Sequence, residues 1–535
     1  MANIGREPCI EGFIRSEKAA APCSKASGPW ILAATILGSS MAFIDGTVVN
    51  VALPALQTNL NATVLDVQWV VESYALFLAA LLLVGGALGD HFGRRLVFMI
   101  GIGLFALASA CCGLALNINQ LTIARAVQGV GGALLVPGSL AIISASFDEE
   151  RRGQAIGTWS GFTAITAAFG PVLGGWLIEH VSWRAVFFIN IPLAVIVILI
   201  SLWRVPESRA SGKKAGLDWA GATLAAAGLG GIVYGLIESS RLGFTHWRVL
   251  STLGGGVILL LIFLIVESRK RNAMLPLTLF RSRNFSGANL LTLFLYMALS
   301  GVLFFFPLNL IQVQGYSATA AGAATLPFVL IMFSLSRWSG GLVKRYGAKL
   351  PLVVGPMIAS LGFLLFTLPE VGNSYWKTFF PAVVVLGLGM AVSVAPLTTT
   401  VMGSVRQERA GVASGINNAV SRTAGLLAVA VFGIVMLHAF NSRLNQRLNA
   451  LDLTPEARSS LDSQRVKLAG TEIPANLESQ TQSEVKQAIA QSFVHGFRLL
   501  MMVAAVLALL SALAAWLMID GKAAPHSLAG QPSPA

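Results

Sequence analysis

Long apolar stretches, separated by short polar ones, recur along nearly the whole chain. Each is about 20 residues long, the length that an α-helix needs to cross a bilayer. They are too long for the strands of a membrane barrel and do not alternate between apolar and polar residues. The pattern predicts an all-α polytopic membrane protein with 14 transmembrane helices. These predicted spans lie near residues 30–53, 69–89, 96–116, 121–144, 155–178, 185–203, 219–238, 248–267, 287–311, 320–343, 351–368, 377–402, 412–439 and 495–519.

Composition agrees with a membrane protein and argues against an enzyme. Of the 535 residues, 55% are hydrophobic and only 11% are charged, and the mean hydropathy is +0.72. Soluble domains carry about 25% charged residues. The phosphate-binding GxxxxGKS/T pattern and the hydrolase patterns HExxH and GxSxG are absent from the sequence. The four cysteines and six histidines form no ligand set, so we expect neither a metal nor a cofactor.

Basic residues are concentrated in every second predicted loop, and together they give a formal net charge of +13. Arg94 and Arg95 lie in one of these loops, whereas the intervening loops hold few basic residues. The positive-inside rule places the basic loops in the cytoplasm, and with them the two tails, residues 1–29 and 520–535. The excess of positive charge therefore reflects membrane topology, and we expect no nucleic-acid partner.

Two short segments recur at nearly equal spacing, which indicates an internal repeat. GALGDHFGRR at 86–95 resembles GGLVKRYGAK at 340–349, and ERRGQAIG at 150–157 resembles ERAGVASG at 408–415. Both shifts equal eight spans, so six helices, two inserted helices and six further helices are predicted. The units are the tail 1–29, a six-helix bundle at 30–203, a linker with two extra helices at 204–286, a second six-helix bundle at 287–519 and the tail 520–535.

One connection is much longer than the others. Residues 440–494 form a polar segment on the predicted extracytoplasmic side, with prolines at 455 and 474 and weakly amphipathic pieces such as SEVKQAIAQSF. Both a short helical hairpin and a disordered loop are compatible with this pattern.

Several motifs together resemble the EmrB/QacA-type drug:proton antiporters of the major facilitator superfamily. They are DGTVVNVALP at 45–54, WVVESY at 69–74, the segment 86–95, and Trp183-Arg184 followed by Asn190 and Pro192. The resemblance implies a major facilitator fold in the cell (inner) membrane and export of hydrophobic, often cationic, drug-like compounds in exchange for protons. For a double-membraned bacterium it also allows a periplasmic adaptor as partner.

The segment 86–95 matches the family's loop between helices 2 and 3, which acts in gating. The resemblance assigns this role to five residues, Gly86, Asp90, Gly93, Arg94 and Arg95. Glycines permit a tight turn, and the charged groups can pair with charges or helix ends across a gating interface. The alternative is a plain cytoplasmic turn with arginines that set topology.

The segment 168–175, AFGPVLGG, resembles the end of the family's antiporter motif in helix 5. The matching residues are Gly157, Gly170, Pro171, Gly174 and Gly175, and Thr166 stands where the family has a glycine. Proline bends a helix and small residues permit close packing. A generic packing helix is the alternative.

Asp45 is the strongest candidate for proton coupling, because an ionisable group inside a membrane span is costly and is usually kept for a function. Arg125, in a segment that resembles the family's helix-4 motif, would modulate it, and Gln128 shares the helix face of Arg125. The alternative is a permanent structural pair between Asp45 and Arg125. Asn50 is expected to form an interhelical hydrogen bond.

Polar residues in other spans are candidates for substrate binding. Together with Gln128 they are Glu72, Asn309 and Asn417. Glu72 would suit lipophilic cations, or would be solvated near the membrane surface. The function favoured by these features is proton-coupled drug export by alternating access. A dedicated exporter of one metabolite, pigment or lipid on the same fold is the alternative.

Overall fold

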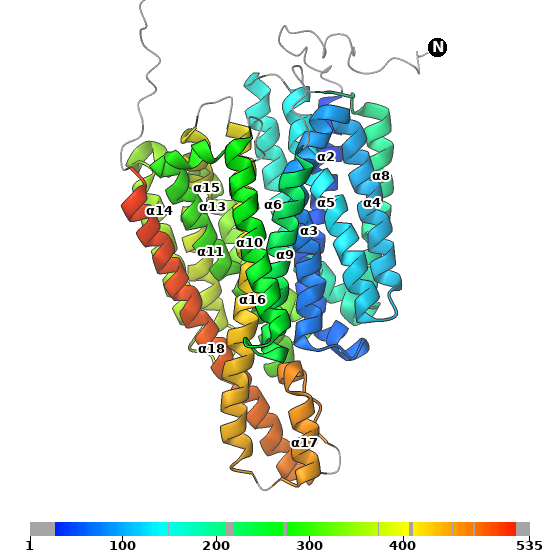
Figure 1. The fold of residues 1–535 in the computed structure, drawn as a ribbon, viewed down its shortest axis with the longest axis vertical. Helices are drawn as coiled ribbons and strands as arrows, with labels where there is room; N and C mark the ends of the chain where they lie inside the picture. The colour runs from blue at the N-terminus through cyan, green and yellow to red at the C-terminus, as the bar shows by residue number, and fades with distance from the viewer. Residues whose placement is uncertain are drawn as a thin grey trace, which may run out of the picture.

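A computed structural model describes residues 27–147, 149–209, 218–270, 275–372, 374–405, 410–451, 453–474 and 477–520. The predicted tails, 1–29 and 520–535, lie almost wholly outside these residues. The first half of the chain is helical (Figure 1). Its helices are α2 (Gly28–Asn59), α3 (Val64–Phe92), α4 (Arg94–Leu114), α5 (Ile118–Ser146), α6 (Glu149–His180), α7 (Ala185–Phe188) and α8 (Asn190–Arg204).

Two inserted helices and the second half complete the architecture. The inserted pair is α9 (Trp219–Leu242) and α10 (Trp247–Arg269). The short 3-10 helix η1 (Leu277–Arg281) leads into the second half. Its elements are α11 (Arg283–Leu308), the π-helical turn η2 (Asn309–Val313), α12 (Ala318–Ala323), α13 (Leu326–Tyr346), α14 (Lys349–Leu365), α15 (Phe379–Gly403), α16 (Ala410–Leu448), α17 (Pro455–Ser463), the 3-10 helix η4 (Arg465–Gly470) and α18 (Ser479–Met518).

The predicted all-α membrane architecture is confirmed, but the count of 14 spans is not. Within the described residues, 12 helical segments are long and apolar enough to cross a membrane. The other two predicted spans correspond to α6 and α14. Helix α14 has only 17 residues, and α6, with 32 residues, is not among the 12 segments.

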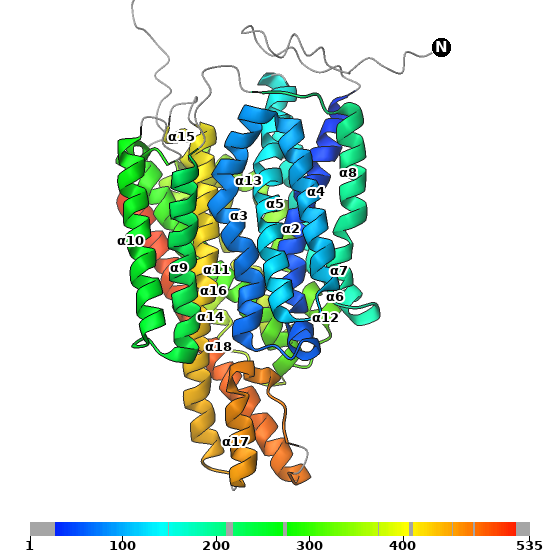
Figure 2. The same cartoon turned by 45° about the vertical axis from the view of Figure 1, so that its right-hand side comes forward.

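The two halves lie side by side, and both chain ends of the bundle are on one side (Figures 1 and 2). We call the side where α2 begins and α18 ends the tail end. The opposite side, where α16 and α18 extend beyond the bundle, is the hairpin end. The internal repeat has a structural counterpart at the tail end. Gly93 between α3 and α4, and Gly347 between α13 and α14, both have positive φ, at 125° and 75°. Only glycine adopts such turns without strain.

The inserted pair lies at the outside of the bundle (Figure 2). Helix α9 packs through Val233 and Ile237 against apolar side chains of α3 and α16, and α10 packs against α9. At the tail end Lys270 forms an ion pair with Asp218, the residue that caps α9. Burial raises the pKa of Asp218, but hydrogen bonds from Lys270 and from the Gly221 amide outweigh burial and hold that pKa below its usual value.

The long connection 440–494 is mostly helical. Helices α16 and α18, with 39 and 40 residues, run beyond the bundle and carry α17 and η4 between them (Figure 1). This hairpin touches both halves. The Lys467 ammonium donates to Asn61 Oδ1 at 2.8 Å, beside α2. Gly470 packs near Gln312 of η2, which itself donates to Gln57 of α2 at 2.7 Å.

Candidate functional site

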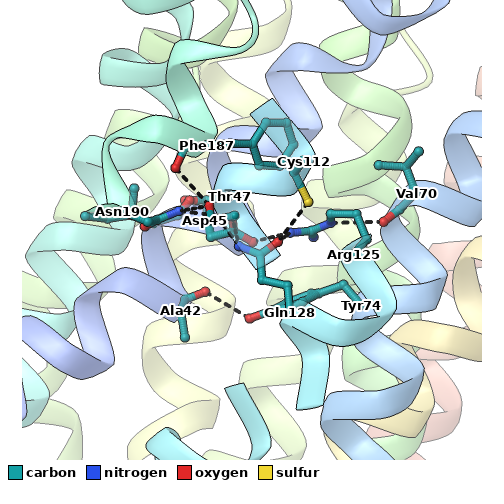
Figure 3. Close-up of polar contacts among 12 residues, drawn as sticks. Ala42, Asp45, Thr47, Val70, Tyr74, Cys112, Arg125, Gln128, Phe187 and Asn190 are labelled. Atoms are coloured by element: carbon teal, nitrogen blue, oxygen red, sulfur yellow. Dashed lines mark hydrogen bonds and ion pairs between the residues drawn. The ribbon is translucent and has the colours of Figure 1, made fainter. Parts of the chain in front are cut away.

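Asp45 lies in the middle of α2, on a face turned toward α5 and α8, and is 1% exposed. Its Oδ2 forms an ion pair with the Arg125 guanidinium. Its Oδ1 accepts a hydrogen bond from Gln128 Nε2 at 2.8 Å and a longer one from Asn190 Nδ2 at 3.4 Å (Figure 3). Both carboxylate oxygens are therefore occupied by neighbouring side chains.

Arg125 of α5 is equally enclosed, with 1% exposure. Besides Asp45, it donates to the Val70 carbonyl at 3.2 Å and to Gln128 Oε1 at 2.7 Å. The guanidinium carbon lies 4.2 Å from the centre of the Tyr74 ring, a distance suited to a cation–π contact. The two charges thus form a neutral pair in an enclosed site, where each charge depends strongly on the other.

A second layer of polar groups orients this pair. Ser109 Oγ accepts from Asn190 at 2.9 Å and from Gln128 at 3.3 Å, and donates to the Phe187 carbonyl at 2.8 Å. The Tyr74 hydroxyl reaches the Ala42 carbonyl at 3.5 Å. Sequence reasoning did not assign Ser109 or Tyr74 to the site, and treated Asn190 only as a landmark.

The structure brings together Asp45 and Arg125, the pair considered from the sequence, and adds Gln128, which the sequence suggested as a substrate ligand. Gln128 is part of the charge network, donating to the carboxylate and accepting from the guanidinium. A proton arriving on Asp45 would neutralise the carboxylate and weaken the ion pair, leaving Arg125 to its two carbonyl acceptors. The same contact also fits the alternative of a permanent structural pair.

The other substrate candidates are not gathered around one point. Asn309 lies buried in η2 near the hairpin end and accepts from Gln314 at 3.4 Å. Asn417 of α16 donates to Asn289 at 3.2 Å and to Thr292 at 2.7 Å, within the second half. Their use as substrate ligands stays a prediction.

Glu72 occupies an unexpected environment. It is 1% exposed, and neither carboxyl oxygen has a hydrogen-bond partner in the described part of the chain. It lies on the same face of α3 as Trp69 and Leu76, which pack against α9 and α16. Solvation of Glu72 at the membrane surface, one of the two interpretations of the sequence, is therefore wrong.

Removal of the Glu72 carboxyl group should not destabilise the protein. A buried polar group without a partner costs about 1–3 kcal/mol, so we expect Glu72→Leu to keep or raise the thermal midpoint in detergent. Glu207 is the matched control, because its carboxylate accepts from the backbone amides of Arg95 and Leu96 at 3.1 Å. Glu207→Leu should lower the midpoint. A Glu72→Leu protein as unstable as Glu207→Leu would contradict this assignment.

Asn50 does not form the interhelical hydrogen bond that we expected. Its side chain is partly exposed and has no hydrogen-bond partner among residues 27–147 or elsewhere in the described chain. Because Asn50 follows Asp45 by five residues, it lies on a different face of α2 from the ion pair.

The predicted gating segment makes its contacts inside the first half. Arg94 pairs with Asp90 one turn earlier, with 2.7 Å between Nη2 and Oδ1. Arg95 donates to the Val205 carbonyl at 2.9 Å. A side chain at Gly93 would collide with Glu207, 2.7 Å from a Cβ atom. Gly86 is less constrained, with its nearest neighbour at 3.7 Å. The motif thus holds the α3–α4 turn against the segment after α8.

The predicted antiporter motif packs α6 against two partners. Gly170 and Gly174 face α2, where a Cβ would lie 2.3 Å from Thr47 Oγ1 and 2.6 Å from Val48, respectively. Gly157 faces open space, so its presence in the motif has no packing explanation here. Thr166, which replaces a glycine of the family, donates to Ser40 of α2 at 3.0 Å.

The end of the same motif forms a contact between the halves. A Cβ at Gly175 would lie 2.4 Å from the Ala318 carbonyl of α12, and one at Gly322 would lie 2.2 Å from the Pro171 carbonyl. Nearby, Glu179 accepts from the Thr319 amide at 2.8 Å and from its hydroxyl at 2.6 Å. Helices α6 and α12 therefore seal the two halves together at the hairpin end.

Residues 35–429 match the sequence pattern of the Major Facilitator Superfamily. The chain belongs to this superfamily. Its fold agrees, because a bacterial homologue of the human lysosomal transporter Spinster, in an inward-facing and unoccupied conformation, superimposes with a TM-score of 0.64 at 17% identity. That comparison covers 94% of this chain and 100% of the other. The protein is thus a major facilitator transporter and not an enzyme.

Two relatives within the major facilitator superfamily match along nearly their whole length. The tetracenomycin C resistance and export protein of Streptomyces glaucescens is 32% identical over 514 residues, which are 95% of this chain and 94% of that protein. The multidrug resistance protein Stp of Mycobacterium tuberculosis is 33% identical over 498 residues, 91% of each chain. The resemblance to drug-efflux members of the superfamily is confirmed.

Proposed function

We propose that this protein is a proton-coupled exporter of hydrophobic, drug-like compounds. The names of its relatives support drug export, and the enclosed network of Asp45, Arg125 and Gln128 supports proton coupling. A carboxylate inside a membrane that pairs with a single guanidinium has two well-defined states, ionised and paired or protonated and released. Such a two-state group is what exchange of a proton for a substrate requires.

In this proposal the two halves rock around a central site. The contact of α6 with α12 closes the hairpin end and must separate when that end opens. Protonation of Asp45 would weaken its hold on Arg125, and Arg125 contacts Val70 and Tyr74 of α3. Helices α3 and α5 pack closely along their length. A change in the contact between Asp45 and Arg125 would therefore be transmitted to helices that contact the other half.

The proposal includes 14 membrane spans, with α6 and α14 crossing the membrane in addition to the twelve others. The basic loops favour a cytoplasmic tail end, in the inner membrane of a bacterial cell. The hairpin of α16, α17 and α18 would then project from the opposite surface. In a double-membraned host that surface faces the periplasm, where a periplasmic adaptor would have access to it.

Proton movement in proteoliposomes tests the coupling. Under an imposed pH gradient, addition of a transported dye should drive proton flux in the wild-type protein. Asp45→Asn should reduce this flux to the level of protein-free liposomes, because asparagine has no titratable group. Asp462→Asn, in the exposed hairpin, is the matched control and should behave as wild type. Equal flux in Asp45→Asn and wild type would show that Asp45 is structural.

A further inference from the structure

Arg422 is a charged residue of α16 that the proposed coupling network does not use. It is partly exposed and forms no hydrogen bond or ion pair with any described residue. Its helix packs against α3 of the first half and α11 of the second. One turn after Arg422, Leu426 packs among apolar side chains of α3, so Arg422 lies near the place where the two halves meet.

The depth of Arg422 makes its missing partner significant. It follows the first residue of α16 by 12 positions, or about 18 Å of helix at 1.5 Å per residue. In a hydrocarbon core about 30 Å thick, this places it far from either surface. An arginine there is expensive and normally has an acceptor, which this chain does not provide among its described residues.

The buried carboxylates of the same region are not available to Arg422. Both oxygens of Asp45 are bound by Arg125, Gln128 and Asn190. Glu72 is buried on the face of α3 that packs against α9 and α16, and its oxygens have no hydrogen-bond partner among the described residues. The junction between the halves therefore presents an unpaired positive charge, and Asp45 offers no free oxygen to a cation.

We propose that Arg422 binds the anionic oxygen of a weakly acidic aromatic substrate between the two halves. This inference rests on the proposed export function and specifies its substrate class. A planar guanidinium binds a carboxylate or phenolate through paired hydrogen bonds and stacks on aromatic rings. Tyr74 of α3 and Tyr296 of α11 belong to the two helices that pack against α16 and would supply aromatic surface. Because Tyr74 also covers Arg125, the bound substrate would adjoin the proton-binding pair.

Two xanthene dyes of similar size and opposite charge test the assignment. Fluorescein is anionic above neutral pH, and rhodamine 6G is cationic. We expect the purified wild-type protein to bind fluorescein at least tenfold more tightly by fluorescence anisotropy. Arg422→Gln should weaken fluorescein binding by about tenfold to a hundredfold, the range for loss of a charged hydrogen bond, and should leave rhodamine 6G binding unchanged or stronger. Arg422→Lys should lose less affinity for fluorescein than Arg422→Gln.

Arg443→Gln is the matched control, because it removes an arginine from the same helix out in the hairpin. It should bind both dyes as wild type does. A wild-type protein that prefers rhodamine 6G, or binds neither dye, overturns the proposal, and so does unchanged fluorescein binding in a folded Arg422→Gln protein. If Arg422→Gln does not fold, the wild-type protein alone tests the proposal: tighter binding of fluorescein than of rhodamine 6G supports it, and the opposite preference refutes it.

The binding measurement needs no proton gradient, so it separates this proposal from the coupling. Arg422-dependent fluorescein binding without Asp45-dependent proton flux would leave the anion site standing and refute the coupling. Proton flux that depends on Asp45 but is driven only by rhodamine 6G would support the coupling and refute the anion site.

Discussion

Arg125→Gln is expected to abolish proton-coupled transport and to lower the free energy of unfolding by about 3–5 kcal/mol, the cost of breaking a buried ion pair on one side. The substitution leaves the Asp45 carboxylate enclosed with only the amides of Gln128 and Asn190 as donors. Thermal unfolding in detergent measures the loss of stability, and dye-driven proton flux in proteoliposomes measures the loss of function.

A double variant distinguishes the ion pair from general damage to the core. Asp45→Asn combined with Arg125→Gln removes both charges and keeps side chains of similar size and polarity. It should recover most of the lost stability while remaining inactive, because no titratable group is left at the site. If the double variant were no more stable than Arg125→Gln alone, the instability would come from packing around Arg125 and not from an unpaired charge.

Gly322→Val should stop transport by a different route, through the contact between the halves. A Cβ at this position would lie 2.2 Å from the Pro171 carbonyl, and a backbone atom cannot turn aside as a side chain can. Overpacking costs about 1–3 kcal/mol, which would shift the balance between access states by roughly fivefold to 150-fold. The state in which α6 and α12 touch should therefore become rare while both halves stay folded.

Accessibility of a cysteine at position 57 would report this shift. Gln57 is 5% exposed, near the end of α2 on the hairpin side. In a background without native cysteines, its labelling by a membrane-impermeant maleimide should rise in Gly322→Val. Gly254→Ala in α10, where a Cβ meets nothing within 4 Å, should leave labelling and transport unchanged. Unchanged labelling in Gly322→Val would mean that α6 and α12 tolerate the side chain without separating.

Much of the membrane architecture could be predicted because hydropathy reports the length of a helix directly. The pairing of Asp45 with Arg125 was also accessible, since two opposite charges in neighbouring apolar spans have few other partners. Hydropathy does not report how a helix is rotated about its axis. Glu72 therefore looked like a cavity or surface residue, although its face of α3 packs against α9 and α16.

Contacts between distant segments were out of reach for a different reason. The Glu207 carboxylate accepts hydrogen bonds from backbone amides of the α3–α4 turn. Because every residue except proline has a backbone amide donor, the sequence does not reveal which of them is used. Asn190 reaches Asp45 across 145 positions, and nothing in its neighbourhood identifies that acceptor. The hairpin was ambiguous because helices outside the membrane need only a narrow apolar stripe, which short polar segments also show by chance.

The balanced charges of Asp45 and Arg125 determine how the membrane voltage acts on the transporter. With Asp45 ionised the pair has no net charge, and with a proton bound it carries one positive charge. If this pair alternates between exposure to the two sides of the membrane, each proton it carries moves one charge through the electric field. At 100 mV a full crossing is worth about 2.3 kcal/mol. Voltage alone, without any difference in pH, would then drive the proton-loaded form inward.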